Sequence, residues 1–258
     1  MLTQAQIDQY RDDGHITPDV RLSPSTVREL TDKMEDFFAR APGVDQDYAP
    51  NLIDQDGSWL EYAALPEILD TVASVIGDDI IVWGSALFAK KGVGGKATPW
   101  HQDGHYWPIR PLATVTAWIA LDDVDRDNGC MRVIPGSHRD GVQYEHFRED
   151  NPDAVLNQAL HVDDDRFGAP RDIVLAPGRF SIHDVHLVHG AEPNNSGRRR
   201  AGLVFRYMPT TSHFDRELAR RQVREMGVLD ISNRQLHLVR GVDRCGRNDV
   251  HSGSPATA

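Results

Sequence analysis

The pattern of residues changes near position 80, and this change constrains the fold more than any other feature of the chain. From there to about residue 208, short runs rich in β-branched and aromatic residues alternate with clusters of Gly, Pro, Asn and Asp. Runs of this length between turn signals are typical of an antiparallel sandwich or barrel. The runs cover residues 80–90, 115–121, 131–134, 173–175, 180–183 and 202–208.

Before residue 80 the sequence predicts helices. Thr3 and Gln6 have the spacing of a capping box, and Gly14 is a suitable end for the helix that they begin. Ser23 starts a second helix whose apolar residues recur on one face, and a third is predicted over residues 66–77. We expect these helices to flank the β core rather than to form a domain of their own.

One mainly β domain with flanking helices is therefore expected over residues 1–247. Its expected parts are a helical N-terminal part (1–79), a β core (about 80–210) and a C-terminal helical part (211–247). Two insertions interrupt this pattern, an acidic one at residues 140–172 and a helical one at residues 214–226. Residues 248–258 are small and polar, which predicts a disordered tail.

Charge and composition argue against several kinds of partner. The formal net charge is −11, and such a chain repels polyphosphate backbones unless it carries a basic patch. Residues 198–200 are the nearest candidate patch, and they are few. No run approaches the roughly 18 apolar residues of a membrane span, the N-terminus lacks a signal-like pattern, and two cysteines cannot form a disulfide framework. We expect a cytoplasmic protein that binds a small molecule, with neither nucleic acid nor membrane as partner and an oligomeric state that the sequence leaves open.

His101 and Asp103 are the first candidate metal ligands. In a strand, residues i and i+2 point to the same face, so this imidazole and this carboxylate can aim at one point. Together they supply two of the three groups of the 2-His-1-carboxylate triad that binds non-haem iron(II). A lone pair of this kind is a weak signal, because short motifs match often by chance.

A second histidine must come from far along the chain, and three follow at positions 183, 186 and 189. The cluster around Asn194 and Asn195 predicts a tight turn between two paired strands. If that turn is central, His189 lies almost opposite Arg200. A metal ligand would then lie one strand away from a guanidinium, whose planar fork suits a carboxylate.

Three blocks of sequence together resemble the phytanoyl-CoA dioxygenase family. They begin at His101 (HQDGHYWPIRP), Asn128 (NGCMRVIPGSH) and His186 (HLVHGAEPN), and Arg200 follows the last of them. The likeness runs over about residues 4–209, which is most of the chain. It implies a double-stranded β-helix, or jelly-roll, core and an oxygenase that depends on iron(II), 2-oxoglutarate and O2.

The resemblance also assigns the metal ligands and the expected reaction. His101, Asp103 and His189 match the family's iron ligands. Related halogenases replace the carboxylate of this motif by Gly or Ala, which frees a coordination position for chloride. Because Asp103 is present, the resemblance favours hydroxylation of a C–H bond, with release of succinate and CO2.

The co-substrate residues follow from the same match. Arg200, eleven residues after His189, matches the arginine that holds the C5 carboxylate of 2-oxoglutarate. Thr116 and Trp118 match positions that line the co-substrate pocket.

Substrate contacts are less well defined by the sequence. His105, Tyr106 and Trp107 follow the metal motif closely enough to line a substrate cavity, although such side chains also serve in packing. His183 would share a strand face with His189 and could orient a ligand. The insertion at residues 140–172 and the C-terminal helical part are the expected covers of the pocket. We expect a small or medium-sized metabolite as substrate, whose identity no motif selects.

Two alternatives stay open from the sequence alone. A metal-binding jelly-roll protein without oxygenase activity would not turn over 2-oxoglutarate, and Arg200 would be dispensable in it. A zinc-dependent hydrolase or lyase could use the same triad, because two histidines and one carboxylate also suit zinc. The position of Arg200 has no explanation in the zinc enzyme.

Overall fold

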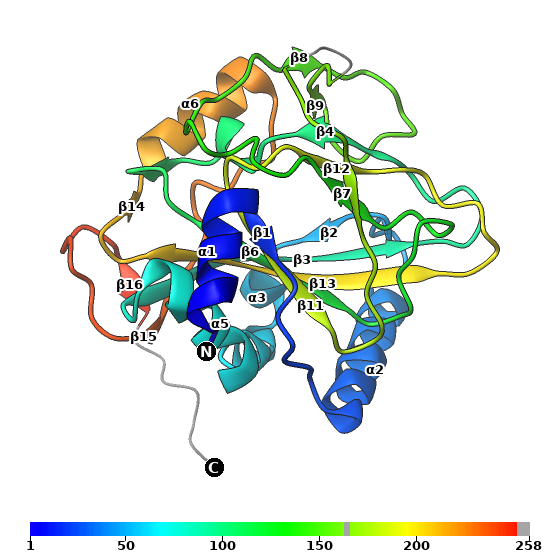
Figure 1. Cartoon of the computed structure of the whole chain (residues 1–258), viewed down its shortest axis with the longest axis horizontal. Helices are drawn as coiled ribbons and strands as arrows, with labels where there is room; N and C mark the ends of the chain where they lie inside the picture. Colours follow the sequence, from blue (N-terminus) through cyan, green and yellow to red (C-terminus); the bar gives the residue numbers. More distant parts are fainter. Residues whose placement is uncertain (163–165, 252–258) are drawn as a thin grey trace.

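Two β-sheets packed face to face form the centre of the molecule, as expected for a jelly roll (Figure 1). The computed structural model describes residues 1–162 and 166–251. In spatial order, the large sheet holds β1 (His15–Ile16), β11 (Phe180–Asp184), β6 (Val115–Ala120), β13 (Arg200–Pro209), β3 (Ile80–Lys90), β15 (Leu236–Arg240) and β16 (Val250–His251), and β2 (Ala49–Pro50) pairs with β3. The small sheet holds β10 (Arg171–Ile173), β7 (Met131–Val133), β12 (His189–Ala191) and β4 (Thr98–His101).

Two short strand pairs lie outside these sheets, β14 (His213–Phe214) with β5 (Ile109–Arg110), and β8 (Phe147–Arg148) with β9 (Gln158–Ala159). The helices are α1 (Gln4–Asp13), α2 (Pro24–Arg40), α3 (Leu52–Gln55), α4 (Leu60–Ala63), α5 (Pro66–Ile76) and α6 (Arg216–Met226), with single 3₁₀ turns η1 (Gly57–Trp59) and η2 (Asp103–His105).

The predicted helix ends follow from local chemistry. Thr3 and Gln6 form the reciprocal bonds of a capping box at the start of α1, and Gly14 ends that helix in the left-handed conformation. Ser23 caps α2 by accepting a hydrogen bond from the backbone N–H of Thr26. Figure 1 shows α2 and α5 below the large sheet, with the small sheet on the opposite side.

The long strands β3 and β13 are buried along almost their whole length. Their outer face packs against α1, α2 and α5 in the largest apolar cluster, which includes Leu30, Trp59 and Phe205. Their inner face points towards the small sheet, where a second cluster includes Trp118 and Val133. Because helices cover one side, the other side of the large sheet is left to form a cavity between the sheets.

Three expectations about element boundaries are wrong. The run expected at residues 173–175 is shifted, because β10 covers Arg171–Ile173. The C-terminal part is not simply helical, because β15 follows α6 and extends the large sheet beside β3. The expected tail begins too early, since β16 pairs with β15 and the side chain of Asn248 bonds the backbone N–H of Phe214. Residues 252–258 of that tail lie outside the described part.

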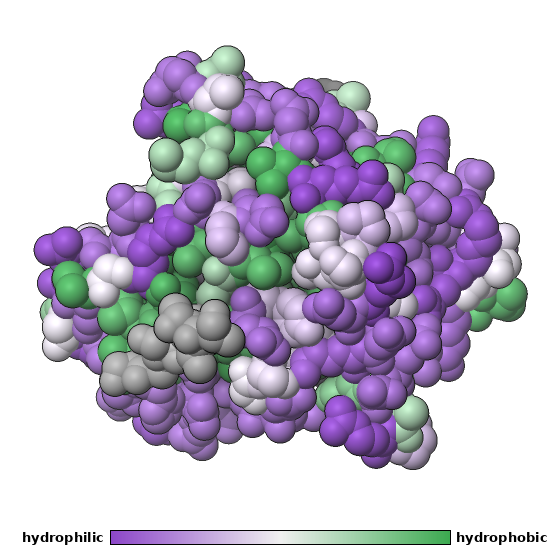
Figure 2. All heavy atoms as spheres, turned by 90° about the horizontal axis from the view of Figure 1, so that it is seen from below, coloured by the Kyte–Doolittle hydropathy of each residue, from purple (hydrophilic) through white to green (hydrophobic). Residues whose placement is uncertain are grey.

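The two insertions close the open end of the sandwich. Residues 140–172 contain β8 and β9, which lie at the top of Figure 1, close to α6. The face turned towards the reader in Figure 2 is mainly hydrophilic, with apolar side chains in patches between charged ones. Within the described residues, no helix combines the length and apolar character needed to cross a membrane.

Candidate metal centre and its cavity

His101, Asp103 and His189 converge at the inner face of the small sheet. His101 ends β4, His189 begins β12, and the two residues are direct partners in the antiparallel register. One donor atom from each of the three buried side chains lies within 4.8 Å of the other two. The Nε2 atom of His101 is 3.5 Å from an Asp103 carboxylate oxygen. This donor set, two imidazoles and one carboxylate, fits iron(II).

Strand alternation does not explain how Asp103 reaches this point. β4 ends at His101, and Asp103 begins the 3₁₀ turn η2. The turn carries the carboxylate back towards the imidazole of His101. The two side chains therefore lie close together as predicted, but through a 3₁₀ turn and not through the expected extended strand. The backbone N–H of Gly104 donates to the carbonyl of Val185, which fixes the turn against the segment that leads to His189.

Backbone carbonyls set the tautomer of both histidines. The Nδ1 of His101 lies 2.8 Å from the carbonyl of Pro99, and the Nδ1 of His189 lies 2.9 Å from the carbonyl of Leu187. A carbonyl oxygen only accepts, so each Nδ1 must carry the proton. Each Nε2 is therefore left with a free lone pair directed at the triad, as a metal ligand requires.

The electrostatics favour the protonation states of a metal site. Burial raises the pKa of Asp103, but the surrounding imidazoles of His101, His183 and His189 outweigh it and hold that pKa well below its usual value. Burial, helped by His101 and His183, holds the pKa of His189 well below its usual value. The carboxylate is thus ionised and His189 is neutral.

Further side chains surround Asp103. The Nε2 of His183 lies 3.6 Å from its second oxygen, and the hydroxyl of Thr116 donates to the same oxygen at 3.4 Å. The hydroxyl of Tyr106 donates to the other oxygen at 3.4 Å. His183 belongs to β11 and not to the strand of His189, so the shared strand face expected for them is wrong, although their rings are 4.6 Å apart. Thr116 contacts the candidate ligand Asp103.

Arg200 approaches the cavity from the other sheet. The expected hairpin between His189 and Arg200 is wrong, because β12 pairs with β4 and β7, whereas β13 pairs with β3 and β6. The two residues face one cavity from opposite walls. The guanidinium of Arg200 is buried, donates to the carbonyl of Gly129 at 3.1 Å and lies 5.4 Å from the centre of the Trp118 ring.

Lys90 is a buried lysine at the end of β3, beside Arg200. It is the register partner of Arg200, it is fully buried, and its ammonium donates to the carbonyl of Glu192 at 2.7 Å. Burial, with the charge of Arg200, lowers the pKa of Lys90 to about 6. Its place at the end of the long buried run 80–90 was the available signal.

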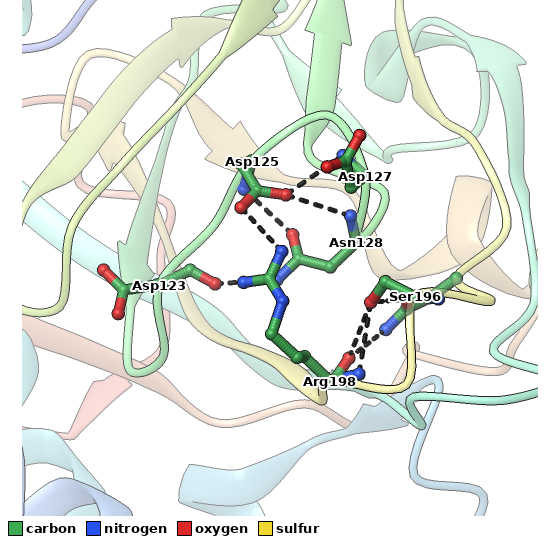
Figure 3. Close-up of polar contacts among 7 residues, drawn as sticks. Asp123, Asp125, Asp127, Asn128, Ser196 and Arg198 are labelled. Carbon is green, nitrogen blue, oxygen red and sulfur yellow. Dashed lines mark hydrogen bonds and ion pairs between the residues drawn. The ribbon is translucent and has the colours of Figure 1, made fainter.

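The three consecutive arginines have separate roles. Arg198 pairs with Asp125 on the surface, within the polar cluster around Asn128 and Ser196 drawn in Figure 3. Arg199 forms two hydrogen bonds with the carboxylate of Asp122 and a third with Glu35. Neither contributes to a continuous basic patch, and Arg200 points inward alone.

The cavity between the sheets has a volume of about 580 Å³, within the usual range for small-molecule sites. Tyr106 and Trp107 line it as expected, together with the triad, Thr116, Trp118 and Arg200. His105 is not among the lining residues and stacks instead on His146, with ring centres 4.0 Å apart. The cover includes residues 149–151 and 154–158 of the insertion and residues 227–229 after α6.

Sequence reasoning missed two cavity cations, Arg206 on β13 and Arg234 before β15. Both are buried. The alternation of β13 placed Arg206 on the face of Arg200 and could have revealed it. Arg234 lies in an irregular segment, where no local pattern marks it.

A jelly roll that carries two histidines and one carboxylate on the wall of the cavity between its sheets is typical of non-haem iron oxygenases. The comparisons name the family. Residues 10–202 match the family Phytanoyl-CoA dioxygenase (PhyH), and the chain belongs to it. It is therefore a dioxygenase that depends on iron(II) and 2-oxoglutarate.

Curated relatives agree with this membership. The chain is 28% identical over 243 residues to the peroxisomal phytanoyl-CoA dioxygenase of Bos taurus, covering 90% of this chain and 70% of that protein. It is 28% identical over 143 residues to a probable alpha-ketoglutarate-dependent hypophosphite dioxygenase of Stutzerimonas stutzeri, covering 55% of this chain and 49% of that one.

Solved structures share the fold. A non-haem monooxygenase, ThoJ, superposes with a TM-score of 0.73 at 22% identity, over 97% of this chain and 88% of its own. The alpha-ketoglutarate-dependent carbocyclase SnoK from nogalamycin biosynthesis superposes with a TM-score of 0.69 at 25% identity, over 83% and 86%.

Proposed function

We propose that the chain hydroxylates a C–H bond of a small or medium-sized metabolite, with His101, Asp103 and His189 as the iron ligands. The convergence of these three donors in a buried cavity carries the proposal. Iron(II) held there would supply the activation of O2, as 2-oxoglutarate is decarboxylated to succinate and CO2 and one oxygen atom enters the C–H bond.

Arg200 is proposed to hold the C5 carboxylate of 2-oxoglutarate. Within residues 1–162 and 166–251 its guanidinium makes one hydrogen bond, through Nε to the carbonyl of Gly129, which leaves its two terminal nitrogens for a bidentate contact with a carboxylate. Trp118 supports the guanidinium from its face. Thr116 is proposed to line the pocket on the metal side, where its hydroxyl orients Asp103.

Hydroxylation is favoured over halogenation by Asp103. An ionised carboxylate at this position fills the coordination position that a halide would need. Thr116, Tyr106 and His183 all contact or approach its two oxygens, so the surroundings of Asp103 are built for a carboxylate.

Chloride tests this assignment without knowledge of the substrate. The protein is loaded anaerobically with iron(II) and 2-oxoglutarate, and the visible charge-transfer band of the chelate is followed while chloride is added. We expect no response from the natural chain and a response from Asp103→Ala. A chloride-dependent shift in the natural chain would contradict a hydroxylase.

A further inference from the structure

Arg206 is a buried cation. Only 7% of its surface is exposed, and within residues 1–162 and 166–251 no carboxylate oxygen lies within 4.0 Å of its guanidinium. Its Nε atom has no hydrogen-bond partner in that part of the chain. Burying a charge without a partner is costly. Its guanidinium lies over the face of Trp107, 5.2 Å from the centre of the ring.

Arg234 is a second cation close to it. It is 6% exposed and lines the same cavity, and its Nε also has no hydrogen-bond partner among the described residues. It bonds the side-chain oxygen of Asn51, and Asp54 lies 3.8 Å away as a loose ion pair. Burial first, and then the charge of Arg206, lowers the pKa of Arg234 to about 10.

The backbone is shaped to admit both guanidinium groups. Gly84 lies beneath them, and a Cβ atom added there would be 2.9 Å from Nη1 of Arg234 and 3.4 Å from Cδ of Arg206. Any other residue at this position must therefore displace an arginine. Trp83 and Trp107, which contact each other edge to face, support one guanidinium each.

This pair is distinct from the proposed co-substrate anchor. Arg200 and Arg206 point from the same face of β13 but are six residues apart, which corresponds to roughly 20 Å along the strand. The register partner of Arg206 is Thr116, which contacts Asp103. A five-carbon dicarboxylate anchored at Arg200 and bound at the triad cannot also reach beyond the triad to Arg206.

We propose that Arg206 and Arg234 form the binding site for an anionic group, a carboxylate or a phosphonate, of the primary substrate. The inference rests on the proposed function, because it places the bound acid beside the triad. The cover of the same cavity contributes the apolar side chains of Val155, Leu156 and Leu229, so the expected substrate is an organic acid with an apolar body. Its acid group lies between the arginines and its body faces the triad.

Matched pairs of probes test this proposal. The protein is loaded anaerobically with iron(II) and saturating 2-oxoglutarate, which occupies the Arg200 end. Hexanoate, octanoate and phenylacetate are then compared with their primary amides, and methylphosphonate and phenylphosphonate form a second arm. Binding is read from the change in the charge-transfer band and from the unfolding temperature. We expect acids to bind and amides not to bind, and the two arms distinguish a carboxylate from a phosphonate substrate.

Substitutions then locate the bound acid. Arg206→Gln and Arg234→Gln should each weaken binding of the acids about 10- to 100-fold, because each removes a charge-assisted contact. Both should leave the affinity for 2-oxoglutarate unchanged, which also shows that the variants fold. Arg220→Gln, on the exposed surface of α6, is the matched control. Arg206→Lys should restore part of the binding.

Gly84→Ala keeps both arginines, but its added Cβ atom would push against the guanidinium of Arg234. We expect it to weaken binding of the acids less than Arg234→Gln does. In the comparison of probes, the proposal is overturned if the amides bind as well as the acids, or if no acid binds at millimolar concentration. Among the variants, it is overturned if binding of the acids survives both Gln substitutions, or if it is unchanged in Gly84→Ala. A natural chain that forms no band with 2-oxoglutarate contradicts the proposed function instead, and the unfolding temperature still reports on the arginines.

Discussion

The two ends of β13 carry buried arginines in contrasting surroundings. At Arg200 the cavity is closed by regular strands, with Lys90 in register beside it and Trp118 across its guanidinium. Arg206 instead lies in register with Gly84 and Thr116, and the neighbouring cation, Arg234, comes from the irregular segment before β15. The first end is thus built by the sheet itself, and the second by a strand together with a loop that the sheet supports. Specificity is expected at the second end, because loops on a rigid scaffold can vary without loss of the fold.

The largest effect is expected from a substitution at the candidate metal centre, on which both ends of the cavity depend. Asp103→Ala removes a candidate ligand that both ends serve, so oxidation coupled to 2-oxoglutarate should fall by several orders of magnitude. Succinate formation under air measures this loss. Asp153→Ala, in the exposed cover, is the control. Full activity in Asp103→Ala would mean that the metal is held elsewhere.

Arg200→Gln should separate the two ends. It removes the proposed bidentate contact with the C5 carboxylate, which would contribute about 2–4 kcal/mol, so the 2-oxoglutarate concentration needed for half-saturation should rise steeply. Arg206→Gln should leave that concentration unchanged. If the two substitutions exchange their effects, the co-substrate lies at the other end of β13.

The pH dependence of stability sharpens the description of the Arg200 end. The pKa of Lys90 is lowered from 10.5 to about 6 in the folded chain, so the unfolded chain binds more protons between these values. Lys90 therefore makes stability rise with pH through this window and fall as the pH drops towards 6. Relative to Lys90→Met, the free energy of unfolding should increase by up to about 1.4 kcal/mol per pH unit. Denaturant unfolding at several pH values measures the difference, and parallel curves would place the Lys90 ammonium in water.

The smallest effect is expected outside the cavity. Arg198→Ala breaks the exposed ion pair with Asp125 (Figure 3), and exposed pairs contribute little because water screens them. The unfolding temperature and the affinity for 2-oxoglutarate should both stay within measurement error. A clear loss of 2-oxoglutarate binding would show that the arginine run acts as one unit.

The sequence predicted the strands around Arg200 better than the segments around Arg206 and Arg234. The long run at residues 80–90 is the strand β3 as predicted, because both of its faces are buried and its apolar pattern is continuous. The capping residues Thr3, Ser23 and Gly14 were also informative, because helix ends depend on local hydrogen bonds.

Long-range pairing could not be predicted in this way. A turn near Asn194 suggested a hairpin, but the chain crosses there from one sheet to the other, so His189 and Arg200 face each other across the cavity. Asp103 reached the predicted point through a 3₁₀ turn. Arg234 is brought to Arg206 only by the fold, and no spacing in the sequence marks the pair.

The anaerobic titration of the metal-free protein with iron(II) and then 2-oxoglutarate tests the central claim most directly. The account predicts a weak visible charge-transfer band that saturates with one equivalent of metal, is altered in Asp103→Ala, and requires much more 2-oxoglutarate in Arg200→Gln than in Arg206→Gln. Iron binding without a band, or a band that is indifferent to both Asp103 and Arg200, would contradict it.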